Sequence, residues 1–201
     1  MCQAFFYFFL YFFYVIFIYD MIPKLKDLLN EAKLTPYQIF APGTGGKEHG
    51  NMKFNPNRIP TGQLKIYSSY DFGGVCFNKP YGAFWTSSYK QKLKGSEWTD
   101  FKKKKFPDWH SSMGAVFEVQ SGVKILKIRN HKDYMKIQKK FPMRVECPSG
   151  ELYLNWRKVS TKYDGVQLTN TDYVPMLGQW DVESTAWFNM KKLKFVGTTK
   201  V

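Results

Sequence analysis

The chain has 201 residues, of which 44% are hydrophobic and 18% aromatic, and this composition fits one globular domain with a real core and excludes wholesale disorder. Its formal charge of +14 at pH 7 indicates an anionic partner, such as nucleic acid, a membrane surface or a phosphate-rich small molecule, or else a lysine-rich but merely solvated surface. The three cysteines, Cys2, Cys76 and Cys147, have no metal-site spacing, and their odd number argues against a disulfide framework and for a reducing compartment.

Residues 1–20 are dominated by an almost wholly apolar run at 4–19. As a helix this run would span roughly 24 Å, which is less than the roughly 30 Å of a bilayer's hydrocarbon core. It has neither the basic leader nor the small-residue cleavage site of a secretory signal. Three interpretations stay open: translation that starts at Met21 rather than Met1, a short signal-anchor that keeps the lysine-rich body in the cytoplasm, or a buried helix. The predicted location is therefore cytoplasmic, in a host cell if the protein is viral, with a membrane-anchored form as the alternative.

Residues 21–62 are expected to form a helix followed by a loop. Apolar residues at helical spacing predict an amphipathic helix over 23–40, with Pro23 in its first turn. The Gly- and Pro-rich residues 41–62 predict a loop. Within the loop, Gly43–Lys47 lacks the glycine spacing and the following Ser or Thr of a phosphate-binding loop, so a plain loop is favoured.

Residues 63–201 are expected to form a single α+β domain with a mixed or antiparallel sheet, because short strands alternate with isolated helices. Ser96, Asn130 and Asn155 are the predicted N-caps of the helices. The tight turn at 121–122 predicts a hairpin between its two flanking strands. Strands are predicted at 63–70, 83–89, 114–120, 123–128, 164–169, 184–188 and 193–196, and helices at 96–106, 131–141 and 156–163.

A four-lysine run lies among aromatic residues in the helix at 96–106. Lysines interleaved with aromatic side chains can hold phosphates and stack bases, which predicts a nucleic acid or an acidic protein as partner. The other interpretation is a helix whose aromatic residues face the core while its lysines are solvated, and the near-helical spacing of Trp98, Phe101 and Trp109 favours it. The candidate partner-binding residues are Lys102, Lys103, Lys104 and Lys105. The three histidines, His49, His110 and His131, are too far apart in sequence to predict a metal site.

A possible ligand cleft is assembled from three polar pieces of the sequence. The strand at 63–70 ends in Tyr67-Ser68-Ser69, the strand at 83–89 ends in hydroxyl side chains, and Glu183 precedes the strand at 184–188. Hydroxyls can orient a ligand, aromatic faces can stack a flat ring, and a carboxylate can stabilise a cationic transition state, which together suit cleavage of a glycosidic bond. Each piece also has a structural interpretation: a core tyrosine, hydroxyls that cap the next helix, and a surface acid.

The order of three motifs resembles the ADP-ribosyltransferase fold. They are FWTSS at 84–88, YDGV at 163–166 and ESTAWFN at 183–189. The resemblance implies a domain that takes NAD as its substrate, without a metal, and cleaves it between nicotinamide and ribose. Glu183 would be the catalytic carboxylate, Thr86 and Ser87 would orient it and the ribose, and Tyr67, Trp85 and Tyr89 would frame the nicotinamide, with Ser68 beside them.

The chain is also similar to a group of phage and bacterial proteins that carry GLWxS, DW…YDG and WDxxS segments, which implies a viral or phage origin. The counterparts here lie at 82–87, 155–165 and 180–184. At the place where the transferase family carries an NAD-anchoring Arg or His, this chain has Tyr67-Ser68-Ser69. Two functions therefore stay open: an ADP-ribosyltransferase-like enzyme, active or degenerate, and a non-catalytic basic module that binds nucleic acid or another partner.

Overall fold

The computed structural model describes residues 37–40, 59–68, 78–90, 94–107, 113–143, 153–169, 177 and 180–201. All of them belong to one compact unit, Thr35–Val201. The apolar run at 4–19, the helix predicted before residue 37, the loop at 41–58, the three cysteines, His49, His110, Ser69 and Trp109 lie outside the described residues.

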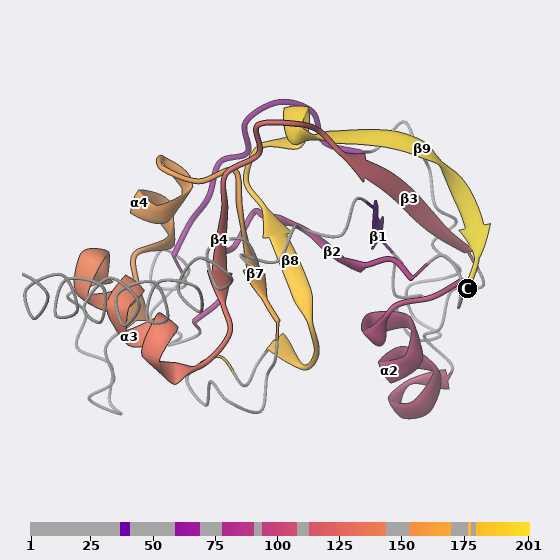
Figure 1. Ribbon diagram of the computed structural model, residues 1–201, viewed down its shortest axis with the longest axis horizontal. Helices are drawn as coiled ribbons and strands as arrows, with labels where there is room; N and C mark the ends of the chain where they lie inside the picture. The colour runs from indigo at the N-terminus through magenta and orange to yellow at the C-terminus, as the bar shows by residue number, and fades with distance from the viewer. Residues whose placement is uncertain are drawn as a thin grey trace, which may run out of the picture. The chain divides into compact units, whose positions relative to one another are not determined.

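A seven-stranded sheet organises this unit, in the order β4-β7-β8-β2-β1-β3-β9 (Figure 1). Neighbouring strands are antiparallel except β4 and β7, which are parallel. The mixed sheet and its helices confirm the predicted α+β class. Its strands are β1 (Tyr37–Phe40), β2 (Phe84–Ser88), β3 (Met113–Val119), β4 (Ile125–Ile128), β7 (Gly165–Leu168), β8 (Ser184–Trp187) and β9 (Leu193–Lys200), while β5 (Pro142–Met143) and β6 (Tyr153–Leu154) pair separately.

Three α-helices begin where the sequence predicts them. The helices are α2 (Glu97–Lys105), α3 (His131–Lys140) and α4 (Trp156–Ser160), and a short 3₁₀ helix, η6 (Met190–Lys192), precedes β9. Ser96 and Thr99 form a capping box at the start of α2, while Asn130 and Asn155 accept backbone N–H groups of α3 and α4. Within the described part of the chain, no helix combines the length and the hydropathy needed to cross a bilayer.

The helix predicted over 23–40 is wrong at its end, because Tyr37–Phe40 is strand β1. This strand lies between β2 and β3 and pairs with both, so both of its edges are hydrogen-bonded. Pro36 disfavours helical geometry at the residue before it, which weakens any helix that runs through this point. Ile39 and Gln38 are fully buried. The domain therefore includes residues before 63, where the sequence had placed its start.

Two predicted strand arrangements also differ from the structure. The strands on either side of Ser121-Gly122 do not pair with each other: β3 pairs with β1 and β9, whereas β4 pairs with β7. Both edges of β3 are thus occupied, and the start of β4 is joined to β7, where the Asp164 side chain accepts the backbone N–H of Lys124 at 2.8 Å. The strand predicted at 63–70 is, over its described residues 63–68, an extended segment held by isolated bridges at Gln63 and Tyr67 rather than a regular strand.

The hydrophobic core lies between the β4-β7-β8-β2 half of the sheet and helices α3 and α4 (Figure 1). Tyr134 and Ile137 of α3 face inward as their spacing predicts, and Trp156 of α4 joins them. Gly165 in β7 permits the strands to pack this closely, because a Cβ at this position would lie 2.9 Å from the Ala186 carbonyl oxygen. The Tyr-Asp-Gly motif at 163–165 thus has a structural role, with Asp164 fixing the strand ends and Gly165 allowing their approach.

Candidate functional site

Glu183 lies at the point where β8 begins beside the end of β2. The two strands are antiparallel, with Thr86 opposite Thr185, and continuing this register by two residues places Ser88 beside Glu183. The hydroxyl-bearing end of β2 and the late acid are thus brought together although they are far apart in sequence. Only 8% of Glu183 is exposed.

Four hydrogen-bond donors converge on the Glu183 carboxylate. Its Oε2 accepts from the Ser87 hydroxyl at 2.8 Å and from the Ser88 backbone N–H at 2.9 Å. Its Oε1 accepts from the Ser88 hydroxyl at 3.0 Å and from the Gln167 amide at 2.9 Å. A carboxylate offers about four lone-pair sites, so these donors engage its whole hydrogen-bonding capacity. We call Ser87, Ser88, Gln167 and Glu183 the carboxylate cluster.

A second buried network lies beside the carboxylate cluster. The Thr86 hydroxyl donates to the Gln38 side-chain oxygen at 2.8 Å and accepts from the Trp187 indole N–H at 2.7 Å. Gln38 also approaches the Ser88 hydroxyl, at 3.4 Å, which links the two networks. Thr86 therefore positions strands β1, β2 and β8, while the donors to Glu183 are Ser87, Ser88 and Gln167.

The carboxylate cluster has a defined chemical capacity. Neutral donors replace the water that an exposed carboxylate would have, and they fix its direction before any ligand arrives. A preorganised negative charge in a poorly solvated position stabilises a positive charge that develops about 3 Å away far better than it would in water. It can also accept a proton from an incoming nucleophile that displaces one of these donors.

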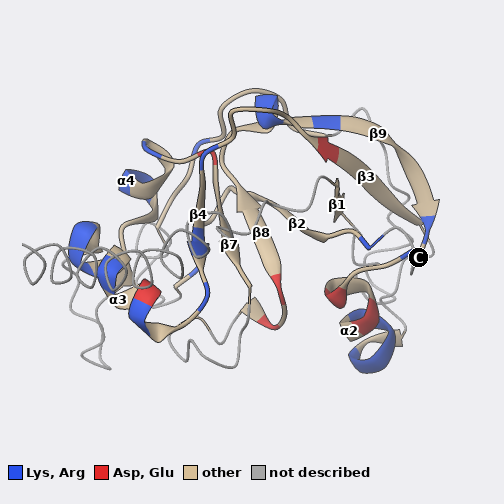
Figure 2. Ribbon diagram, in the orientation of Figure 1, with Lys and Arg blue, Asp and Glu red and all other residues tan. Residues whose placement is uncertain are grey.

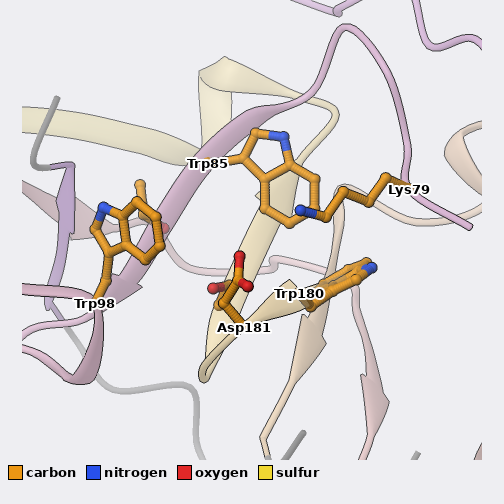
Figure 3. A pocket seen from close by; sticks show the side chains of 7 residues that line it. Lys79, Trp85, Trp98, Trp180 and Asp181 are labelled. Atoms are coloured by element: carbon orange, nitrogen blue, oxygen red, sulfur yellow. The ribbon is translucent and has the colours of Figure 1, made fainter. Parts of the chain in front are cut away.

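A cavity of about 220 Å³ adjoins the start of β8 (Figure 3). Trp85 and Thr86, two of the predicted binding residues, line it, and Ser184, the chain neighbour of Glu183, lines it too. The other lining residues are Lys79, Trp98, Trp180 and Asp181. The cavity therefore reaches the chain neighbour of Glu183 but none of the residues of the carboxylate cluster.

The remaining predicted binding residues lie outside the cavity lining. Tyr67 pairs through its backbone with Tyr81, and Ser68 is buried. The Tyr89 hydroxyl lies 3.5 Å from the Thr199 hydroxyl of β9. The structure thus brings Trp85 and Thr86 to one cavity and Ser87 to Glu183, but it does not gather Tyr67, Trp85 and Tyr89 around one ring.

The sequence analysis missed two members of these networks. Gln167 is a polar residue between Val166 and Leu168 in a strand whose residues are all buried, and such an interruption of an apolar strand is a readable signal. Gln38 carried no signal, because its segment was taken for a helix. The strand beside β2 is β1, so the residue nearest the hydroxyl-bearing strand end on that side is Gln38, and the extended segment with Tyr67 and Ser68 is not part of the sheet.

The predicted four-lysine surface is wrong for its first member. Lys102 is only 1% exposed, and its Nζ lies 5.8 Å from the centre of the Trp98 ring. The three lysines that follow it are exposed. A larger group of exposed basic residues lies on α3, on α4 and just after α4 (Figure 2). We call it the α3–α4 basic surface, and its exposed cationic residues are Lys132, Lys136, Lys139, Lys140, Arg157, Lys158 and Lys162.

Burial of Lys102 makes stability depend on pH in a specific direction. Desolvation lowers the pKa of Lys102 from 10.5 to about 8. Below pH 8 the folded and unfolded states are both protonated and the fold carries the full desolvation cost, whereas between about 8 and 10.5 the unfolded state binds more protons. The contribution of Lys102 to the free energy of unfolding therefore rises across this range.

Urea denaturation of the wild type and of Lys102→Met at pH 7 and pH 9.5 measures this contribution. The wild type should gain more stability than the variant between the two pH values, because Met cannot lose a proton. Lys103→Met is the matched control, since its side chain is exposed, and it should follow the wild type. An equal pH response of the wild type and Lys102→Met would contradict the assignment.

Within the described residues, no group of three or more His, Cys, Asp or Glu side chains is placed to hold a metal ion. Comparisons of the chain with protein-family models, with curated proteins and with solved structures find no match.

Proposed function

We propose that the chain is an ADP-ribosyltransferase-like protein that cleaves NAD at the bond between nicotinamide and ribose, with Glu183 as the catalytic carboxylate. The observation that carries the proposal is the convergence of Ser87, Ser88 and Gln167 on Glu183. The resemblance in sequence assigned the acid and the adjacent hydroxyl strand separately, and the two lie in direct hydrogen-bond contact.

The proposed reaction needs little proton transfer at the leaving group. The bond from the ribose C1′ to the nicotinamide nitrogen breaks, and nicotinamide leaves with the electron pair as a neutral molecule. The positive charge that develops on the ribose is stabilised by the Glu183 carboxylate. Water or an acceptor side chain then attacks C1′ and loses its proton to Glu183 or to solvent. The products with water are ADP-ribose, nicotinamide and a proton.

The energetic character of the carboxylate cluster supports this role. Burying an ionised carboxylate costs roughly several kcal/mol, even after the surrounding protein has adjusted to the charge. A strand end with no chemistry to perform could be closed by apolar residues at lower cost.

The test is the release of nicotinamide from NAD by the purified protein, with Glu183→Gln assayed beside the wild type. The proposal predicts release above the rate in buffer for the wild type and a large loss in the variant. Equal rates for the wild type, the variant and buffer would overturn it.

A second candidate function, binding of nucleic acid without catalysis, is favoured by the α3–α4 basic surface. Of the described residues on α3 and α4, the one acid is Asp133, and it is paired with Arg129 at 2.8 Å. A cationic surface of this kind binds phosphates by releasing counterions. The site would be α3 and α4, rather than the lysine run of α2 that the sequence indicated.

Binding of a fluorescent DNA duplex over a range of salt concentrations tests this candidate. The logarithm of the association constant should fall linearly with the logarithm of salt concentration, and Lys136→Gln and Lys139→Gln should each reduce the slope by about 1. Lys103→Gln and Lys104→Gln on α2 are matched controls and should leave the slope nearly unchanged. Binding that is insensitive to salt, or that depends on the α2 lysines alone, would contradict it.

A further inference from the structure

The cavity beside β8 is built from parts of the chain that are distant in sequence. Lys79 precedes β2, Trp85 and Thr86 belong to β2, and Trp98 comes from α2. Trp180, Asp181 and Ser184 come from the entry to β8. Five of these seven residues were not among the residues predicted to bind a ligand, so the cavity is a feature of the fold and not of a sequence motif.

Three indole rings form the walls of the cavity. The rings of Trp85 and Trp180 are 4.7 Å apart between centres and meet at 75°, so they make a corner. Figure 3 shows Trp98 on the opposite side of the cavity from this corner. Flat rings bind well between such surfaces, because stacking on aromatic side chains needs no match of hydrogen-bond donors and acceptors.

The size of the cavity limits what can enter it. Its volume of about 220 Å³ exceeds the roughly 150 Å³ of an engineered cavity that accepts benzene. It is smaller than the roughly 300–1,000 Å³ of pockets that enclose a drug-sized molecule. One bicyclic ring fits inside, and any larger substituent must project from the mouth.

The cavity lining carries one cationic side chain, the half-buried Lys79, and one acidic side chain, Asp181. The Lys79 Nζ lies 5.7 Å from the centre of the Trp85 ring. Burial lowers the pKa of Lys79, while the charge of Asp181 partly offsets this by raising it. An ammonium group that has lost part of its water gains from an anionic partner, and it repels a cationic ligand. Asp181 is exposed at the same opening and can accept ligand hydroxyls.

We propose that this cavity binds a nucleobase-sized flat ring that carries an anionic group, with the ring against the indoles and the anion on Lys79. A 5′-mononucleotide has this chemistry: a bicyclic base, a sugar with hydroxyls for Asp181, and a phosphate. Glu183 does not line the cavity, so the site is independent of the proposed cleavage of NAD and stands or falls separately from it.

Calorimetric titration of the full chain with adenosine 5′-monophosphate, adenosine and inorganic phosphate tests the assignment. The mononucleotide should bind with a dissociation constant below about 1 mM, adenosine about tenfold more weakly, and phosphate alone without measurable heat. In Lys79→Met the mononucleotide and adenosine should bind equally, because Met fills the same space without the charge. Lys124→Met, at an exposed lysine just before β4 and outside the cavity lining, should keep the tenfold preference.

A second variant keeps the test decisive if Lys79→Met fails to fold. Trp98→Leu should weaken the binding of the mononucleotide and of adenosine alike, by about tenfold or more, because it removes one of the indole rings on which the base stacks. Glu118→Gln, at an acid of β3 outside the cavity lining, should leave both affinities unchanged. The proposal is overturned if adenosine binds the wild type as tightly as the mononucleotide, if Lys79→Met keeps the preference, if Trp98→Leu changes neither affinity, or if the mononucleotide gives no heat up to about 10 mM.

Discussion

Replacing Glu183 with Gln is expected to slow the release of nicotinamide from NAD by about 10²- to 10⁴-fold. Gln has nearly the same shape as Glu but carries no negative charge, so it cannot stabilise the positive ribose in the transition state. One of the two carboxylate oxygens also becomes an amide NH₂, which cannot accept the hydrogen bonds that the surrounding groups donate. The Ser88 backbone N–H is one such group. The loss should appear in kcat more than in KM, because the charge acts mainly on the transition state.

The same substitution should reduce the free energy of unfolding by about 1–3 kcal/mol, because at least one buried donor loses its acceptor. Activity must therefore be measured well below the melting temperature of the variant. Glu118→Gln is the matched control: Glu118 lies in β3 and makes only a 4.0 Å pair with Lys194, so both activity and stability should stay near wild type. Ser87→Ala, which removes one of four donors and keeps the charge, should have an intermediate effect on activity.

A Glu183→Gln variant that is destabilised as expected but turns over NAD at the wild-type rate would assign the carboxylate cluster a purely structural role. A Glu118→Gln variant that loses activity to the same extent would show that the assay reports folding rather than chemistry.

Replacing Trp180 with Ala is expected to destabilise the domain by about 3–5 kcal/mol, the largest effect on stability that we predict. Trp180 is 2% exposed, and its ring contacts those of Trp85 and Trp156, at 4.7 Å and 6.0 Å between centres. Its indole N–H donates to the Asn78 backbone carbonyl at 3.2 Å, and the substitution also removes this buried hydrogen bond. Chemical denaturation followed by circular dichroism measures the change.

Trp98→Ala is the control for Trp180, since both indoles line the same cavity but Trp98 is only partly buried on α2. Its cost should be about 1 kcal/mol or less, because less apolar surface is lost from contact. If Trp98→Ala were as destabilising as Trp180→Ala, burial of Trp180 in the core would not explain its contribution to stability.

Local signals predicted the helices well. Ser96, Asn130 and Asn155 are N-caps whose bonds join residues three apart, as in the 3.0 Å bond from the Asp133 N–H to Asn130, and such short-range chemistry is legible in sequence. The strands at 114–120, 164–169 and 184–188 were predicted for the same reason, because alternation or a short apolar run is a local pattern.

Strand pairing could not be predicted, because it depends on contacts between distant residues. The turn at Ser121-Gly122 is real, but the next strand pairs with β7, because β1 and β9 occupy both edges of β3. Tyr37–Phe40 was taken for the end of a helix, because nothing within that segment shows that β2 and β3 lie on either side of it.

The site, like the fold, was predictable from the sequence only in part. Ser87 and Glu183 were singled out from their motifs, and they meet across 96 residues of sequence. Gln38 is hydrogen-bonded to Thr86 from 48 residues away, and only the order β8-β2-β1 makes the two neighbours. The three tryptophans of the cavity could not be grouped without the strand order either, because they come from the entry to β8, from β2 and from α2.

Proton NMR of NAD incubated with the wild-type protein tests the central claim most directly, because it identifies the bond that is broken. The proposed function predicts that signals of free nicotinamide and ADP-ribose grow together as those of NAD decline, and that they do not grow with Glu183→Gln. NAD that stays intact with the folded wild-type protein, or that is split at its pyrophosphate instead, would contradict the assignment of Glu183 as the carboxylate that cleaves the glycosidic bond.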